Sequence, residues 1–165
     1  MLFRSMNELK IPISAPEAKL WSVDDPNLYV CEVELSEGKN WVDKDSRRFG
    51  FRWFEASGIG EDAVFRLNGK RIMLRSAISW SFWPVNGIFP SEELAERQIR
   101  IAKELGLNML NFHRFIGNTD VMNYADELGL LYFEEPGGFR LDVKQPFMNA
   151  VLHEKVIRMV KRDRS

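Results

Sequence analysis

The sequence predicts an α/β fold with a β-rich N-terminal part, and three observations point to this class. Residues 1 to about 60 contain the apolar–polar alternation that is typical of strands. From about residue 71 the pattern changes to a strand followed by a helix, three times in succession. A short motif repeats 23 residues apart, as ELGL at 104–107 and again at 127–130. Repeated strand–helix units imply parallel strands, as in a parallel barrel or a wound sheet.

Composition limits the classes of function. The chain has 165 residues, of which 45% are hydrophobic, enough for one or two small domains with a core. The net charge of −1 argues against a nucleic-acid or membrane-surface partner. A single cysteine and two histidines disfavour a disulfide or a metal site, and the sequence contains no nucleotide-binding glycine motif, so no cofactor is predicted. No signal peptide is recognised at the N-terminus, which leaves the compartment of a parent protein open between cytoplasmic, periplasmic and secreted.

The N-terminal strands are the first predicted elements. Residues 29–35 alternate, and Tyr29, Cys31, Val33 and Leu35 are expected on one buried face. Residues 36–40 form a turn signal, and a second alternation predicts another strand over 49–54. Because a sandwich needs about seven strands, this region predicts only the last part of one.

A tight hairpin is expected next. Residues 64–67 and 70–74 flank Asn68-Gly69, the dipeptide favoured in two-residue turns because both positions tolerate positive φ. The first strand of the parallel sheet is predicted over residues 71–79.

Three helices follow. Ser91 is a predicted N-cap, with Glu92 and Glu93 suited to the positive end of a helix that stops at Gly106. Two further strands are expected at 107–112 and 130–133, with a helix between them that ends at Gly129, and a third helix at about 146–162. Three parallel strands cannot close a barrel of about eight, so we expect the chain to be part of a larger protein and to expose open sheet edges suited to self-association.

Polar residues near the end of the second parallel strand form the first candidate site. Side chains alternate along a strand, so Leu110 and Phe112 are expected to face the helices, and Asn111 and His113 the opposite face. The C-terminal ends of barrel strands are where such folds bind substrates. The alternative is a hydrogen-bonded core histidine, and for Arg114 a structural ion pair.

Two further groups are candidates. Glu134 and Glu135 end the third strand, but neighbours on a strand point to opposite faces and cannot flank one bond together. One is expected to point into the site and the other to meet a helix or loop, unless both only anchor loops. Trp80 and Trp83 follow the first strand, where indole rings can stack on sugars or instead plug the core under a loop.

Several segments together resemble a known family. Residues 21–29 read WSVDDPNLY and are similar to the W-s-p-e-x-P-x-L-Y segment of glycoside hydrolase family two. Residues 48–52 (RFGFR), 65–75 (FRLNGKRIMLR), 105–108 (LGLN), 125–130 (ADELGL) and 161–164 (KRDR) follow in the order of that family. The chain differs where the family has Gly, Asn and His after the first barrel strand, with Ser76, Ile78 and Trp80 there.

The resemblance implies an immunoglobulin-like sandwich, here residues 1–60, that leads into a (β/α)8 barrel, here residues 61–165. It also implies hydrolysis of a β-glycoside with retention of configuration, by two glutamates that we expect beyond Ser165, so no catalytic residue is predicted within the chain. His113 corresponds to a histidine that often contacts the sugar. The predicted substrate-binding residues are His113, Asn111, Arg114, Trp80, Trp83 and Glu135.

Three hypotheses follow for the chain itself. It is a fragment of a β-glycosidase that is inactive alone, a non-catalytic carbohydrate-binding or assembly module, or a truncation without function.

Overall fold

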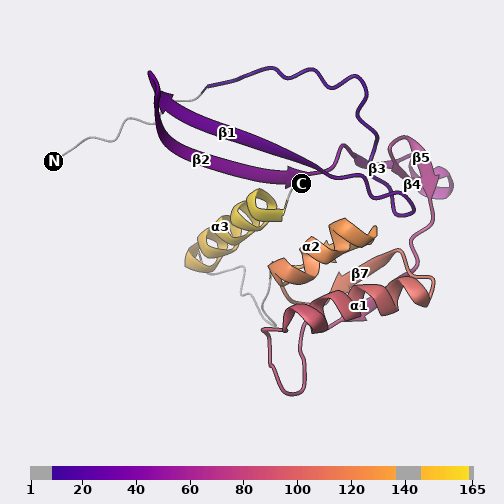
Figure 1. Ribbon diagram of the computed structural model, residues 1–165. Helices are drawn as coiled ribbons and strands as arrows, with labels where there is room; N and C mark the ends of the chain where they lie inside the picture. Colours follow the sequence, from indigo (N-terminus) through magenta and orange to yellow (C-terminus); the bar gives the residue numbers. More distant parts are fainter. Residues whose placement is uncertain (1–8, 137–145, 164–165) are drawn as a thin grey trace.

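The computed structural model describes residues 9–136 and 146–163, which form a mixture of strands and helices (Figure 1). This mixture confirms the α/β class, whereas the sandwich and the barrel stay predictions. The elements in chain order are β1 (Tyr29–Glu37), β2 (Asn40–Phe49), β3 (Phe54–Ser57), the 3-10 turn η1 (Gly60–Asp62), β4 (Val64–Leu67), β5 (Lys70–Ile72), β6 (Ser76–Ser79), α1 (Glu92–Glu104), β7 (Met109–Phe112), α2 (Thr119–Leu128), β8 (Leu131–Glu134) and α3 (Pro146–Asp163).

β1 and β2 form a long antiparallel hairpin along one side of the molecule (Figure 1). The turn lies where the sequence predicts it, but the strand expected over 49–54 is wrong: β2 ends at Phe49, Phe51 makes an isolated bridge with Leu20, and β3 begins at Phe54. Most of the hairpin is exposed on both faces, so residues 40–48 need no apolar alternation to form a strand.

The predicted buried face of β1 is only partly confirmed. Tyr29 and Cys31 are half-buried, and the ring of Tyr29 packs against Phe51 with its centroid 5.4 Å away. Val33 and Leu35 are 55% and 59% exposed, which contradicts the expectation for them. The hairpin extends beyond the aromatic contacts at its base, and that extension leaves these two side chains uncovered.

β3, β4 and β5 form a three-stranded antiparallel sheet. Asn68 and Gly69 have φ values of 53° and 76°, which confirms the predicted two-residue turn between β4 and β5. β3 and β4 pair across residue 60, where the sequence suggests a boundary between domains, and the division into domains stays a prediction.

The single strand predicted over 71–79 is wrong, because β5 ends at Ile72 and β6 begins at Ser76 in another sheet. The side chain of Asn108 occupies this break. Its Nδ2 donates to the carbonyl of Met73 over 2.9 Å, and its Oδ1 accepts from the backbone N–H of Arg75 over 2.7 Å. The backbone between β5 and β6 therefore bonds to a side chain 33 or more residues away instead of continuing a strand ladder.

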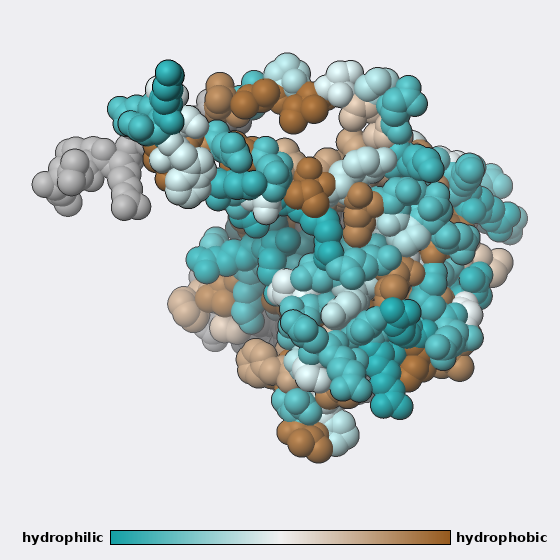
Figure 2. Space-filling model, viewed as in Figure 1, coloured by the Kyte–Doolittle hydropathy of each residue, from teal (hydrophilic) through white to brown (hydrophobic). Residues whose placement is uncertain are grey.

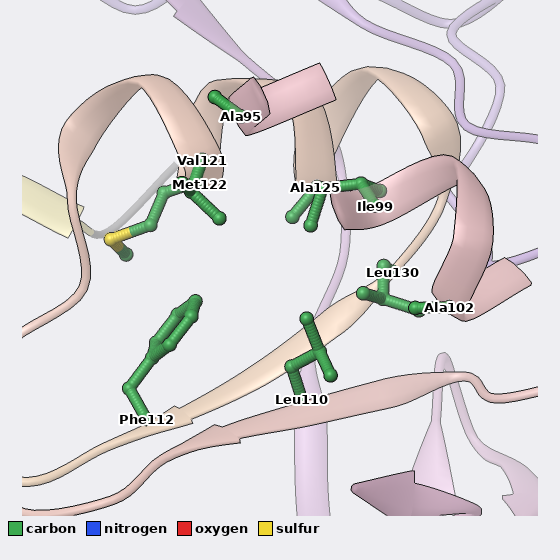
Figure 3. Packing of buried hydrophobic residues seen from close by; sticks show 9 residues of the cluster. All are labelled: Ala95, Ile99, Ala102, Leu110, Phe112, Val121, Met122, Ala125 and Leu130. Carbon is green, nitrogen blue, oxygen red and sulfur yellow. The ribbon is translucent and has the colours of Figure 1, made fainter. Parts of the chain in front are cut away.

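β6, β7 and β8 form a parallel sheet, as the strand–helix alternation predicts, and α1 and α2 pack against it. Figure 3 shows Leu110 and Phe112 pointing from β7 toward these helices, which confirms the predicted face. The core residues drawn there are Ala95, Ile99, Ala102, Leu110, Phe112, Val121, Met122, Ala125 and Leu130.

Local signals define the helix ends. The Oγ of Ser91 accepts the backbone N–H of Leu94 over 3.3 Å, as predicted for an N-cap. Gly106 and Gly129, the glycines of the repeated motif, both adopt left-handed φ after their helices, at 77° and 78°. α3 covers 146–163, close to the expected range.

Candidate functional site

The C-terminal ends of the three parallel strands bring together Trp80, His113 and Glu135. The rings of Trp80 and His113 meet edge to face, with centroids 4.7 Å apart and planes at 82°. The Nδ1 atom of His113 lies 3.5 Å from Oε1 of Glu135. The imidazole and the carboxylate are half-buried and the indole is 56% exposed, so the cluster opens to solvent.

The register of the sheet explains why these three residues meet. Ser79, Phe112 and Glu134 lie opposite one another on β6, β7 and β8, and the site residues are the next residues along each strand. The N–H of His113 donates to the carbonyl of Ser79 over 3.0 Å, so the ladder continues one residue past the end of β7. When neighbouring parallel strands end in register, the residue that follows each strand lies next to its counterparts at the C-terminal end of the sheet.

The adjacent carboxylates of Glu134 and Glu135 have different partners. Glu134 accepts the backbone N–H of Gly117 over 2.6 Å and lies 3.5 Å from Nη2 of Arg162 on α3, whereas Glu135 meets His113. The pKa of Glu134 is raised to about 7, first by burial and then by the carboxylate of Asp163, whose effect exceeds the lowering effect of the nearby Arg162 guanidinium. The two carboxylates thus point apart, as alternation along the strand predicts.

The other predicted site residues lie in different surroundings. Asn111 is half-buried on the same strand as His113, and its buried Oδ1 has no hydrogen-bond partner among the described residues. Trp83 packs against the hydrophobic core, in agreement with the alternative reading of a core plug, and its backbone pairs with Gly87 over 2.7 and 2.8 Å. Arg114 is exposed, with a left-handed φ of 56°.

Three polar residues next to the cluster were missed by sequence reasoning. The Oγ of Ser79 accepts Nε2 of Gln98 over 2.6 Å and the backbone N–H of Ser81 over 3.2 Å. Both serines flank Trp80 in the sequence, a Ser-Trp-Ser pattern that could have drawn attention to them. Gln98 gives no such signal, because it lies on α1 and its contact with Ser79 is formed only by the fold.

The geometry supports ligand binding more directly than bond cleavage. An indole, an imidazole and a carboxylate lie together at the C-terminal end of the parallel strands, and such groups contact C–H surfaces and hydroxyl groups. Over residues 9–136 and 146–163, no three His, Cys, Asp or Glu side chains are placed to hold a metal ion. None of the helices in these same ranges is long and apolar enough to cross a bilayer.

A separate groove of about 890 Å³ lies between β2, α2 and α3. Its lining includes Arg48, Asn123, Tyr132 and Lys161, and it shares no residue with the Trp80, His113 and Glu135 cluster.

Comparison with known proteins gives a consistent result. Residues 3–52 match the sequence profile described as "Glycosyl hydrolases family 2". The chain is 34% identical to a putative beta-glucuronidase of Formosa agariphila, over 71% of this chain and 14% of that protein. It is also 34% identical to a beta-galactosidase of Thermoanaerobacterium thermosulfurigenes, over 75% of this chain and 17% of that protein.

Solved structures agree with the sequence matches. The apo structure of beta-glucuronidase 3 from Bacteroides uniformis aligns with a TM-score of 0.74 at 27% identity, over 88% of this chain and 18% of that one. A glycosyl hydrolase family 2 member from Bacteroides cellulosilyticus aligns with a TM-score of 0.74 at 28% identity, over 88% of this chain and 19% of that one. The chain thus spans less than a fifth of the length of each of these four proteins.

Proposed function

Because the chain belongs to glycosyl hydrolase family 2, we propose that it forms part of a retaining β-glycosidase and contributes sugar-binding residues to it. The observation that carries the proposal is the contact of Trp80, His113 and Glu135 at the C-terminal ends of the parallel strands. The names of the relatives, beta-glucuronidase and beta-galactosidase, support a β-glycoside as the substrate class.

Each residue of the cluster has a role that fits a sugar. The exposed indole of Trp80 offers an apolar face for the C–H groups of a pyranose ring. The imidazole of His113 hydrogen-bonds a hydroxyl group, and the carboxylate of Glu135 orients that imidazole while accepting from a second hydroxyl. Asn111 lies on β7, its amide oxygen has no hydrogen-bond partner within residues 9–136 and 146–163, and it is the fourth proposed contact.

Hydrolysis by this chain alone is not expected. A retaining glycosidase needs two carboxyl groups about 5–5.5 Å apart on either side of the scissile bond. Glu134 is engaged with Gly117 and Arg162, which leaves Glu135 as the one carboxylate of this pair in the cluster. We expect the acid/base and nucleophile glutamates to lie outside residues 1–165, as the motif order of the family implies.

Calorimetric titration of the purified chain with galactose, mannose and glucuronate tests the binding role. We expect at least one sugar to bind with a Kd near 1 mM, which corresponds to roughly 4 kcal/mol, and we expect Trp80→Ala and His113→Ala to weaken that binding about tenfold. Trp41→Ala, at an exposed tryptophan on the distant β1–β2 hairpin, is the matched control and leaves it unchanged.

Two results would contradict the proposal. Absence of binding for all three sugars at about 20 mM, well above the expected Kd, refutes the binding role. Turnover of a chromogenic β-glycoside that disappears in Glu135→Gln refutes the statement that the chain lacks its catalytic pair.

A further inference from the structure

We propose that Gln98 is a positioning residue for the sugar site, because it holds Trp80 against His113 through the hydroxyl of Ser79. The inference rests on the function proposed above for Trp80 and His113. It concerns a residue of α1 whose side chain is hydrogen-bonded to Ser79, the residue before Trp80.

Ser79 is the point where the contacts of the site converge. Its backbone carbonyl accepts the N–H of His113 over 3.0 Å. Its hydroxyl accepts Nε2 of Gln98 over 2.6 Å and the backbone N–H of Ser81 over 3.2 Å. The buried residue Ser79 is therefore hydrogen-bonded to the backbone N–H of His113 and to that of Ser81, the residue after Trp80.

The conformation of Ser81 makes this contact important. Its φ of 49° is left-handed, a region that residues with a Cβ atom rarely occupy, and the residue is buried. The bond from the Ser81 N–H to the Ser79 hydroxyl holds the backbone in that conformation. Because Trp80 lies between these serines, the same bond determines where the indole ring points.

The hydrogen bond from Gln98 fixes the orientation of the Ser79 hydroxyl. With the Gln98 amide donating to one lone pair and the Ser81 N–H to the other, the oxygen acts as a double acceptor and its own proton is directed elsewhere. Without the amide, the hydroxyl can rotate and its bond to Ser81 loses this orientation. The turn that carries Trp80 then loosens.

A purely structural role explains Gln98 poorly. Its Oε1 is buried without a hydrogen-bond partner among the described residues, and an unsatisfied buried oxygen is unfavourable. A leucine at this half-buried helix position would avoid that unfavourable burial and keep a high helix propensity. The bond that Nε2 makes to Ser79 is the feature that a leucine cannot supply.

Proton NMR of the 165-residue chain measures the position of Trp80 without any sugar. The chain has two histidines, and His153 is exposed on α3, so His153→Gln assigns the imidazole signals of His113. Because the two rings lie 4.7 Å apart, we expect the ring current of Trp80 to displace these signals in the wild type and Trp80→Ala to abolish that displacement. We expect Gln98→Leu to remove at least about half of it.

Arg97→Leu is the matched control, because it removes a polar side chain from the adjacent, exposed position of the same helix. We expect the His113 signals to stay at their wild-type position in this variant. His113 signals that are unchanged in Gln98→Leu, but move in Trp80→Ala, would overturn the proposal. An equal movement in Arg97→Leu would also overturn it, because it would indicate a general loosening of α1.

Ser79→Ala provides a second route if Gln98→Leu is poorly folded. It removes one hydroxyl from a strand, and we expect it to displace the His113 signals as Gln98→Leu does. The double variant Ser79→Ala/Gln98→Leu should show no further displacement, because both changes interrupt one path. Additive displacements would contradict an action of Gln98 through Ser79.

Sugar titration separates this inference from the proposed function. If the wild type binds a sugar, we expect Gln98→Leu to weaken binding about fivefold, which corresponds to about 1 kcal/mol. Unchanged affinity together with displaced His113 signals would refute the positioning role. If the wild type binds no sugar, the proposed function fails, and with it the role of Gln98 in binding, whereas the NMR signals still decide whether Gln98 holds Trp80 against His113.

Discussion

The fold strongly alters the chemistry of Glu134. Its side chain is 6% exposed and lies between the backbone N–H of Gly117 and the end of α3, where Arg162 and Asp163 face it. On its own strand, the hydroxyl of Tyr132 donates to the carbonyl of Asp163 over 2.8 Å. The pKa of Glu134 rises to about 7, mainly by burial, so the folded chain binds its proton more tightly than the unfolded chain does.

This shift predicts how stability depends on pH. Because the pKa is higher in the folded state, the stabilisation is fully present below about pH 4.5 and is lost as the pH rises to about 7. The loss is on the order of 3 kcal/mol. Glu134→Gln keeps an oxygen for the Gly117 N–H and does not ionise, so its free energy of unfolding should lack this decline.

Urea unfolding of both proteins between pH 4 and pH 8 measures the difference. The wild type and Glu134→Gln should diverge above about pH 5, with the variant the more stable of the two at pH 8. Parallel stability curves would show that Glu134 does not titrate in this range. Glu154→Gln, at an exposed carboxylate paired with Arg158 within α3, is the control and should follow the wild type.

At the scale of elements, a buried ion pair joins the segment before β3 to α2. Nη2 of Arg52 lies 2.7 Å from Oδ1 of Asp126, and their side chains are 14% and 12% exposed. The guanidinium also lies over the ring of Trp21 at 4.2 Å, and Nε1 of Trp21 donates to the backbone carbonyl of Asp126 over 2.7 Å. Trp21 is fully buried, so this contact fastens the N-terminal segment to the helix that covers the parallel sheet.

Two arginine substitutions distinguish this pair from a surface one. Arg52→Leu removes the guanidinium that lies 2.7 Å from the buried carboxylate of Asp126, and we expect it to lower the free energy of unfolding by about 3 kcal/mol. Arg48→Leu breaks the more exposed pair with Glu127 on the same helix and should lower it by less than about 1 kcal/mol. Chemical denaturation of the two variants measures both changes, and equal losses would refute a special role for the buried pair.

At the scale of elements, features set by neighbouring residues could be predicted from the sequence, whereas features set by contacts between distant residues could not. Helix ends are encoded by neighbouring residues, so Ser91, Gly106 and Gly129 were predicted correctly. The break between β5 and β6 depends on the side chain of Asn108, and no pattern within residues 71–79 reveals that contact. The contact of Gln98 with Ser79 likewise joins residues far apart in the chain, whereas Trp80, His113 and Glu135 were singled out because each lies at or just beyond the end of a predicted strand.

At the scale of the whole molecule, apolar side chains remain on the surface. Figure 2 shows hydrophobic groups along the extended segment above the β1–β2 hairpin, where Leu9, Ile11 and Ile13 are exposed. Val33 and Trp41 of the hairpin are exposed as well, and β1 and β2 pair only with each other among the described strands. Exposed apolar side chains beside unpaired strand edges favour pairing with another chain.

We therefore propose that isolated chains associate through this hairpin, with a second copy as the partner. Sedimentation velocity between about 10 and 500 μM, a range in which weak contacts form, should show a sedimentation coefficient that rises with concentration. Val33→Lys places a charge on the hairpin, where Asp45 of β2 lies opposite and can accommodate it, and should reduce the rise. Val85→Lys makes the same change at a side chain that is 96% exposed outside the hairpin, and should behave as the wild type. A wild-type coefficient that is constant over this range would exclude self-association, and equal effects of the two variants would move the contact away from the hairpin.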